Sequence, residues 1–137
     1  MPIVWTPRLA VGVPQIDEEH QELFARVNTL VEALSAAKAR DVVAPLIGFL
    51  RDYVNVHFGG EQALMRAHRY VGSAEHLQQH QYFVNEFEKL VKEFEQAGPS
   101  GLLTIKLNRL LCDWLRDHVA VTDKQFGTFL QSKGIGV

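Results

Sequence analysis

Seven histidine and carboxylate side chains have the types and spacing of metal ligands. They are His20 in IDEEHQELF, His57 and Glu61 in HFGGE, His76 and His80 in HLQQH, and His118 and Asp123 in HVAVTD. His57 lies four residues before Glu61, and His76 lies four residues before His80, which places the members of each pair on one face of an α-helix. Buried without a cation, these imidazoles and carboxylates would carry a large desolvation cost. The sequence therefore predicts a metal site.

The ligand types narrow the choice of metal. Cys112 is the only cysteine, which excludes zinc–cysteine and iron–sulfur sites and also an internal disulfide. HLQQH has the histidine spacing of a zinc protease, but Leu77 stands where the general-base glutamate would be. The Glu-x-x-His pairs of carboxylate-rich di-iron oxidases do not occur in the sequence. Imidazole with carboxylate favours iron, with manganese and zinc as alternatives.

The number of ligands predicts two ions, because seven exceed what one first-row ion can use. If both carboxylates bridge the ions and one oxide or hydroxide also bridges them, eleven of the twelve positions of two octahedral ions are filled. One position stays open, on the ion with fewer histidines. An external ligand would bind there.

Asp123 does not fit a straight helix. It lies five residues after His118, which at 100° per residue puts it about 140° round the helix. For both side chains to face inward, the helix must bend, widen or end between them. We therefore predict an irregular helix at residues 119–124. A straight helix with Asp123 facing solvent would exclude it as a ligand.

Four amphipathic segments position these residues. Apolar side chains recur every three or four positions from Asp17 to about residue 38, from Asp41 to Met65, over 73–97, and from Gly101 to His118. No segment alternates as a strand would. Helices of about 20 residues joined by short loops predict an all-α, antiparallel up-down-up-down four-helix bundle.

The ends of the helices carry recognisable signals. Asp17 and Asp41 are predicted to be the N-caps of the first two helices. Gly98 and Pro99 are predicted to end the third. Gly127 is predicted to mark a break before a short C-terminal helix. Residues 1–16 contain breakers but also apolar residues that need a packing partner, so they predict an ordered N-terminal arm; these residues are Trp5, Leu9, Val11, Val13 and Ile16.

Two adjacent glycines interrupt the second helix between His57 and Glu61. Mid-helix glycines cost about 1 kcal/mol each relative to alanine. We therefore hypothesise that Gly59 and Gly60 are needed for close packing or for room for a ligand.

Length and composition bound the class of protein. With 137 residues, the chain is expected to form one domain, 1–137, with the bundle over 17–130. A net charge of −2 and a pI near 6.3 argue against nucleic acid as a partner. No stretch approaches the roughly 18 apolar residues of a membrane span, and the N-terminus lacks the pattern of a signal peptide. A cytoplasmic protein, without membrane insertion, is expected.

The sequence resembles the hemerythrin family, in particular its single-domain bacteriohemerythrins. The resemblance runs from VGVPQIDEEH through HFGGEQALM and HLQQHQYF to WLRDHVAVTDKQF, nearly the whole chain. It implies an oxo- or hydroxo-bridged pair of iron ions. One iron would be bound by His76, His80 and His118 and the other by His20 and His57, with Glu61 and Asp123 bridging. Dioxygen would bind as hydroperoxide on the two-histidine iron.

The resemblance also implies an oxygen pocket formed by Leu23, Phe58, Trp114 and Val119. The family commonly has isoleucine at the position of Val119, so this pocket is expected to be about one methylene roomier. It also commonly has a second glutamate where this chain has Gln62. These departures bear on oxygen affinity and on the rate of autoxidation. They leave the predicted ligands unchanged.

The expected function is reversible dioxygen binding, for carriage or storage, by a monomer that is not an enzyme. An oxygen-consuming enzyme or a redox protein is the expected partner. One alternative is an oxygen or redox sensor that signals to a partner. Another is a di-iron enzyme that handles peroxide or nitric oxide, which would need electrons from elsewhere because the sequence contains no second redox centre.

Overall fold

Four helical columns form the protein in a computed structural model that describes residues 5–35, 39–98 and 100–135. The described residues contain helices and no strand, which confirms the all-α prediction. The first column is α1 (Pro14–Ser35) and the third is α4 (Ser73–Ala97). The second consists of α2 (Ala39–Tyr53), the π-helical η2 (Val54–Phe58) and α3 (Gly59–Ala67). The fourth consists of α5 (Gly101–Arg109), the π-helical η3 (Leu110–Leu115) and η4 (His118–Asp123), and α6 (Lys124–Ser132).

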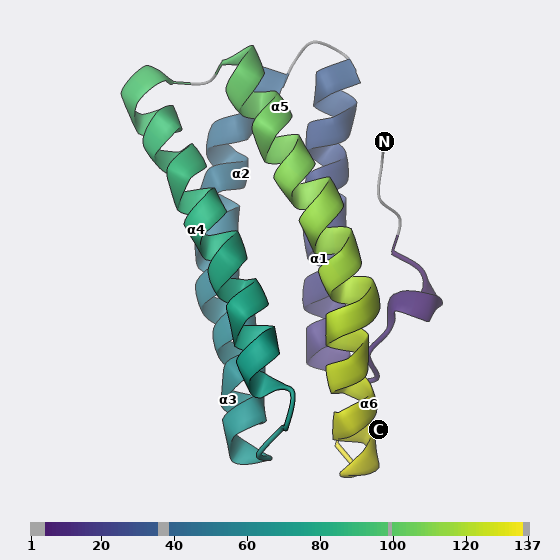
Figure 1. Ribbon diagram of the computed structural model, residues 1–137. Helices are drawn as coiled ribbons and strands as arrows, with labels where there is room; N and C mark the ends of the chain where they lie inside the picture. The colour runs from purple at the N-terminus through teal and green to yellow at the C-terminus, as the bar shows by residue number, and fades with distance from the viewer. Residues whose placement is uncertain (1–4, 36–38, 99, 136–137) are drawn as a thin grey trace.

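The columns run alternately up and down, as Figure 1 shows. α1 rises behind the α5–α6 column, and the α2–α3 column descends. α4 then rises, and the α5–α6 column descends to the C-terminal end. Gly98 ends α4 with a φ of 71°, a conformation that favours glycine, as predicted. Pro99 and the predicted end of the first helix near residue 38 lie outside the described residues. The predicted antiparallel four-helix bundle is confirmed.

Two apolar clusters fill the bundle on either side of a polar layer. The larger contains Leu23 on α1 and Phe58, Phe83 and Val119 on the other columns. The smaller joins the N-terminal arm to α3 and α6 and contains Val11, Val13, Ile16, Met65, Phe126 and Leu130. In the first, second and fourth columns the predicted ligands lie in the chain between residues of the two clusters, so apolar side chains close the polar layer at both ends.

The described part of the N-terminal arm, residues 5–13, is ordered, and hydrogen bonds hold it to the bundle; residues 1–4 of the predicted arm lie outside the described residues. It includes the short 3-10 helix η1 (Pro7–Leu9). The Asp17 carboxylate accepts hydrogen bonds from the backbone N–H groups of Val11 (2.7 Å) and Gly12 (3.3 Å). Lys124 donates to the carbonyl oxygens of Arg8 (2.9 Å) and Ala10 (2.6 Å). These contacts link the arm to both α1 and the start of α6.

Both predicted N-caps are wrong. α1 begins at Pro14 and α2 at Ala39, so Asp17 and Asp41 lie within the first helical turns. Asp17 binds the amides of the arm. A carboxylate in the first turn is also stabilised by the helix dipole, which gives the same sequence signal as an N-cap.

The roles predicted for the glycines are also wrong. Gly127 lies inside α6, and a Cβ there would overlap the carbonyl oxygen of Val11, so the glycine permits close approach of the arm and does not break the helix. Gly59 and Gly60 are exposed, and a Cβ at either would have no neighbour within 4 Å. Neither close packing nor room for a ligand requires them.

No helix among residues 5–35, 39–98 and 100–135 has both the length and the apolar character to cross a membrane.

Candidate metal centre

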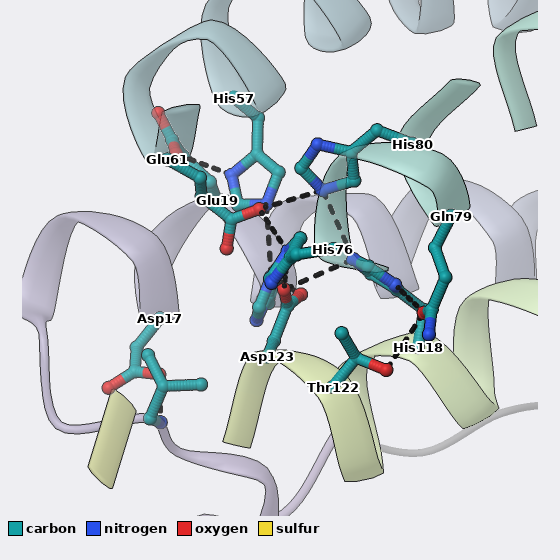
Figure 2. A network of polar contacts seen from close by, with 12 residues as sticks. Asp17, Glu19, His57, Glu61, His76, Gln79, His80, His118, Thr122 and Asp123 are labelled. Atoms are coloured by element: carbon teal, nitrogen blue, oxygen red, sulfur yellow. Dashed lines mark hydrogen bonds and ion pairs between the residues drawn. The ribbon is translucent and has the colours of Figure 1, made fainter. Parts of the chain in front are cut away.

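All seven predicted ligands are buried and meet in the polar layer. Their exposed fractions lie between 0% and 3%. Every column contributes at least one of them, and Figure 2 shows the side chains converging from the helices. The set is His20 on α1, His57 on η2, Glu61 on α3, His76 and His80 on α4, and His118 and Asp123 on η4.

The ligand atoms form two overlapping groups, each with all atoms within 4.8 Å of one another. One group contains His76, His80 and His118, and the other contains His20 and His57. Glu61 and Asp123 belong to both groups. The buried cluster thus divides into a group with three histidines and a group with two, with both carboxylates in each group; that these residues bind metal stays a prediction.

Asp123 faces both halves, one oxygen to each. Its Oδ2 lies 3.0 Å from Nε2 of His20 in the two-histidine half. Its Oδ1 lies 3.0 Å from Nε2 of His76 and 3.1 Å from Nε2 of His118 in the other half. Glu61 is less symmetric, with Oε1 3.2 Å from Nε2 of His80 and 3.6 Å from Nε2 of His57. This arrangement is that of carboxylates able to bridge two cations.

A widened helix turns Asp123 inward. The π-helical η4 spans His118 to Asp123, so the step of five residues from one ligand to the other approximates one turn. This confirms the irregularity predicted at residues 119–124. A second π-helical segment, η2, contains His57 and Phe58, and a third, η3, contains Trp114. These two were not predicted.

The buried carboxylate oxygens and imidazole nitrogens lie close to one another, but several of them form no hydrogen bond. Both carboxylate oxygens of Glu61 and of Asp123, and Nε2 of His76, are buried without a hydrogen bond. Nε2 of His20 faces Nε2 of His57 at 3.0 Å, and Nε2 of His80 faces Nε2 of His118 at 3.2 Å. Buried carboxylates and imidazoles of this kind are stabilised when a cation binds them. The residues therefore fit a pair of metal ions.

Burial and mutual charge set the proton affinities of the cluster. Burial, together with the charge of Asp123, raises the pKa of Glu61 well above its usual range. Burial opposes ionisation of Asp123, but the surrounding imidazoles, His118 foremost, hold its pKa well below the usual range. Burial lowers the pKa of His80 to about 2 and also lowers that of His57. Neutral histidine is the form that binds metal.

Outer partners orient three of the histidines. Nδ1 of His57 lies 2.6 Å from a carboxylate oxygen of Glu19, and this hydrogen bond lowers the pKa of Glu19. Nδ1 of His118 lies 2.7 Å from the amide oxygen of Gln79, and Nδ1 of His80 lies 3.2 Å from the Gln62 amide. These partners were not predicted. Their one sequence signal is that Glu19, Gln62 and Gln79 each adjoin a predicted ligand in the chain.

Two of the predicted oxygen-pocket residues, Phe58 and Trp114, stack on ligands of the centre. Leu23, Phe58 and Val119 are buried in the larger apolar cluster. The Phe58 ring stacks on His80, with ring centroids 3.8 Å apart. Trp114 is half-buried, stacks on His118 at 4.4 Å, and also lines a surface groove of about 680 Å³. Their role as an oxygen pocket stays a prediction.

Comparison with known proteins gives one consistent result. A family model described as "Hemerythrin HHE cation binding domain" matches residues 11–130. "Bacteriohemerythrin" of Methylococcus capsulatus is 29% identical over 95% of this chain and 98% of that protein. "Bacteriohemerythrin" of Stenotrophomonas maltophilia is 28% identical over 90% of this chain and 78% of that protein. "Hemerythrin subunit 2" of Golfingia vulgaris is 32% identical over 91% of this chain and 90% of that protein.

Proposed function

Because the chain belongs to the hemerythrin family, we propose that it binds dioxygen reversibly, for carriage or storage, at a non-haem di-iron centre. The observation that carries the proposal is the division of the ligands. Two carboxylates are shared between a three-histidine half and a two-histidine half, and the oxygens of Asp123 face one half each.

In this proposal His76, His80 and His118 hold one iron and His20 and His57 hold the other. Glu61 and Asp123, which belong to both ligand groups, would be shared between the two ions. By the ligand count, an external ligand would bind on the two-histidine side. When bound, the iron pair would supply the two electrons needed to hold dioxygen reversibly.

Side chains beside the centre support reversibility by excluding water and protons. Leu23 and Val119 are 1% and 0% exposed, and Phe58 covers one face of His80. Excluding water from a site limits proton leakage and side reactions. An apolar surrounding of this kind favours release of intact dioxygen over its further reduction.

We propose that the protein acts as a binding protein and not as an enzyme. Within the described residues the ligand clusters able to hold a metal are the two halves of this one centre. Catalytic turnover would therefore need electrons from another protein. The proposed partners are dioxygen and an oxygen-consuming enzyme or a redox protein, and the proposed state is a cytoplasmic monomer.

The test is reversible oxygenation. Protein loaded with ferrous iron without air is exposed to dioxygen and then degassed while its visible spectrum is recorded. We expect a charge-transfer band that appears with dioxygen and disappears on degassing over repeated cycles. His57→Ala should abolish the band, whereas Asp117→Ala, a change at an exposed position beside His118, should preserve it. Immediate irreversible oxidation would contradict carriage and favour sensing or turnover.

A further inference from the structure

Gln79 connects α4 to the helix that carries two of the proposed ligands. It precedes His80 on α4 and is half-buried. Its Oε1 accepts a hydrogen bond from Nδ1–H of His118 at 2.7 Å and another from the Thr122 hydroxyl at 2.8 Å. Figure 2 shows the Gln79 side chain directed toward His118 and Thr122, which both lie in η4. One amide oxygen thus contacts two residues within the π-helical η4, His118 at its start and Thr122 near its end.

The acceptor beside Nδ1 determines which ring nitrogen of His118 is free to bind a metal. Because the acceptor at Nδ1 is an oxygen, that nitrogen carries the proton, and Nε2 offers its lone pair to the centre. The Thr122 hydroxyl donates to the same oxygen, which keeps the amide turned with Oε1, and not Nε2, toward the ring. Thr122 also adjoins Asp123, so the same contact holds the segment that presents the bridging carboxylate.

The two halves of the centre differ in the charge of this outer partner. His57, in the two-histidine half, has the Glu19 carboxylate at 2.6 Å, whereas His118 has a neutral amide. Gln62, beside His80, is also a neutral amide, but it faces Nδ1 with its amide nitrogen, at 3.2 Å, and so offers no acceptor there. A carboxylate acceptor makes an imidazole a more basic ligand than an amide acceptor does. The anion therefore strengthens a ligand in the half that has fewer histidines.

We propose that Gln79 is a positioning residue that holds His118 in the metal-binding tautomer. Because Gln79 is a neutral partner, the three-histidine half donates less electron density to its iron than it would with a carboxylate partner. Glu19 acts in the opposite sense on the two-histidine half. The amide thus limits how strongly the centre favours ferric iron. This inference rests on the proposed function to the extent that it requires iron at the centre.

The first test measures how firmly iron is held. We expect Gln79→Leu to weaken iron binding about 10- to 100-fold, measured as faster extraction of ferrous iron by a chelator. Gln79→Glu should restore slow extraction, because a carboxylate also accepts from Nδ1–H. Thr122→Val should have a smaller effect, since the bond to His118 remains. Gln78→Leu is the matched control, the same change at the exposed neighbour, and should match the unchanged protein.

The second test measures the midpoint potential, which a purely structural link between helices would not alter. Gln79→Glu should lower the potential, and Glu19→Gln should raise it. A tenfold change in ferric preference corresponds to about 59 mV for one electron. Equal potentials for Gln79→Glu and the unchanged protein, or extraction from Gln79→Leu at the control rate, would overturn the proposal. Iron that binds but does not take up dioxygen reversibly would instead contradict the proposed function alone.

Discussion

Replacing Glu61 by glutamine separates its predicted role as a metal ligand from any role in packing. The side chain is 1% exposed, and its oxygens make no hydrogen bond. An amide of nearly the same shape removes the buried carboxyl group. It can also donate to the imidazole nitrogen of His80, which lies 3.2 Å from Oε1. The substitution therefore preserves the volume of the side chain and changes its chemistry.

The expected effects on the metal-free and iron-loaded forms have opposite signs. Because burial raises the pKa of Glu61, the metal-free fold is destabilised by holding this carboxyl group out of water, and a neutral amide of similar volume removes that cost. We expect Glu61→Gln to stabilise the metal-free protein by about 1 kcal/mol. The iron-loaded form should be destabilised. Metal at 100 times its dissociation constant contributes about 2.7 kcal/mol, and most of this is lost if one bridging ligand is removed.

The assay is urea unfolding followed by circular dichroism, with and without iron, in the absence of air. We expect the gap between the two forms to be at least about 2.7 kcal/mol in the unchanged protein at saturating iron, and to collapse in the variant. Glu18→Gln, an exposed change two residues before His20, is the control and should alter neither form. A variant less stable without iron, or one with an unchanged gap, would refute the reasoning.

Three further predictions follow from packing and protonation. Val119→Ile should slow autoxidation of the oxygenated protein by excluding water, and an unchanged rate of oxidation in the visible spectrum would count against it. Gly127→Ala should lower the free energy of unfolding by about 1–3 kcal/mol because its Cβ overlaps the Val11 backbone. Gly59→Ala should raise the free energy of unfolding by about 0.5–1 kcal/mol, since its Cβ meets nothing. Urea unfolding measures both, and equal effects would disprove the contrast. The pKa of His80 is about 2 when folded and 6.5 when unfolded, so its stabilisation is present above pH 6.5 and is lost by about 1.4 kcal/mol per pH unit below it. The metal-free protein should therefore lose helix content on acidification below about pH 6.5, as followed by circular dichroism, and an unchanged free energy of unfolding from about pH 6.5 to about 4 would contradict this.

The helices and the facing of the ligands could be predicted because burial imposes a period on the sequence. His57 to Glu61 and His76 to His80 are steps of four, which the α-helix itself places on one face. The step of five from His118 to Asp123 violated that period, and the violation predicted the widened segment that η4 confirms.

The remaining features could not be predicted, because they depend on contacts between distant segments. Apolar residues keep their regular helical spacing through η2, so the sequence gives no sign of this π-helical segment. The need for glycine at position 127 comes from the arm, more than 100 residues earlier in the chain. The contacts of Glu19 and Gln79 likewise cross between helices, 38 and 39 residues apart in sequence. The local sequence pattern determines which face of a helix is buried, whereas these details depend on which distant segments come into contact.

We propose that seven side chains hold two irons, which bind one dioxygen and return it intact. The most direct measurement is the amount of dioxygen released on degassing, relative to the iron bound in the same sample. We predict one dioxygen released for every two irons. Dioxygen that is consumed without being released, or iron bound at one ion per chain, would contradict the claim.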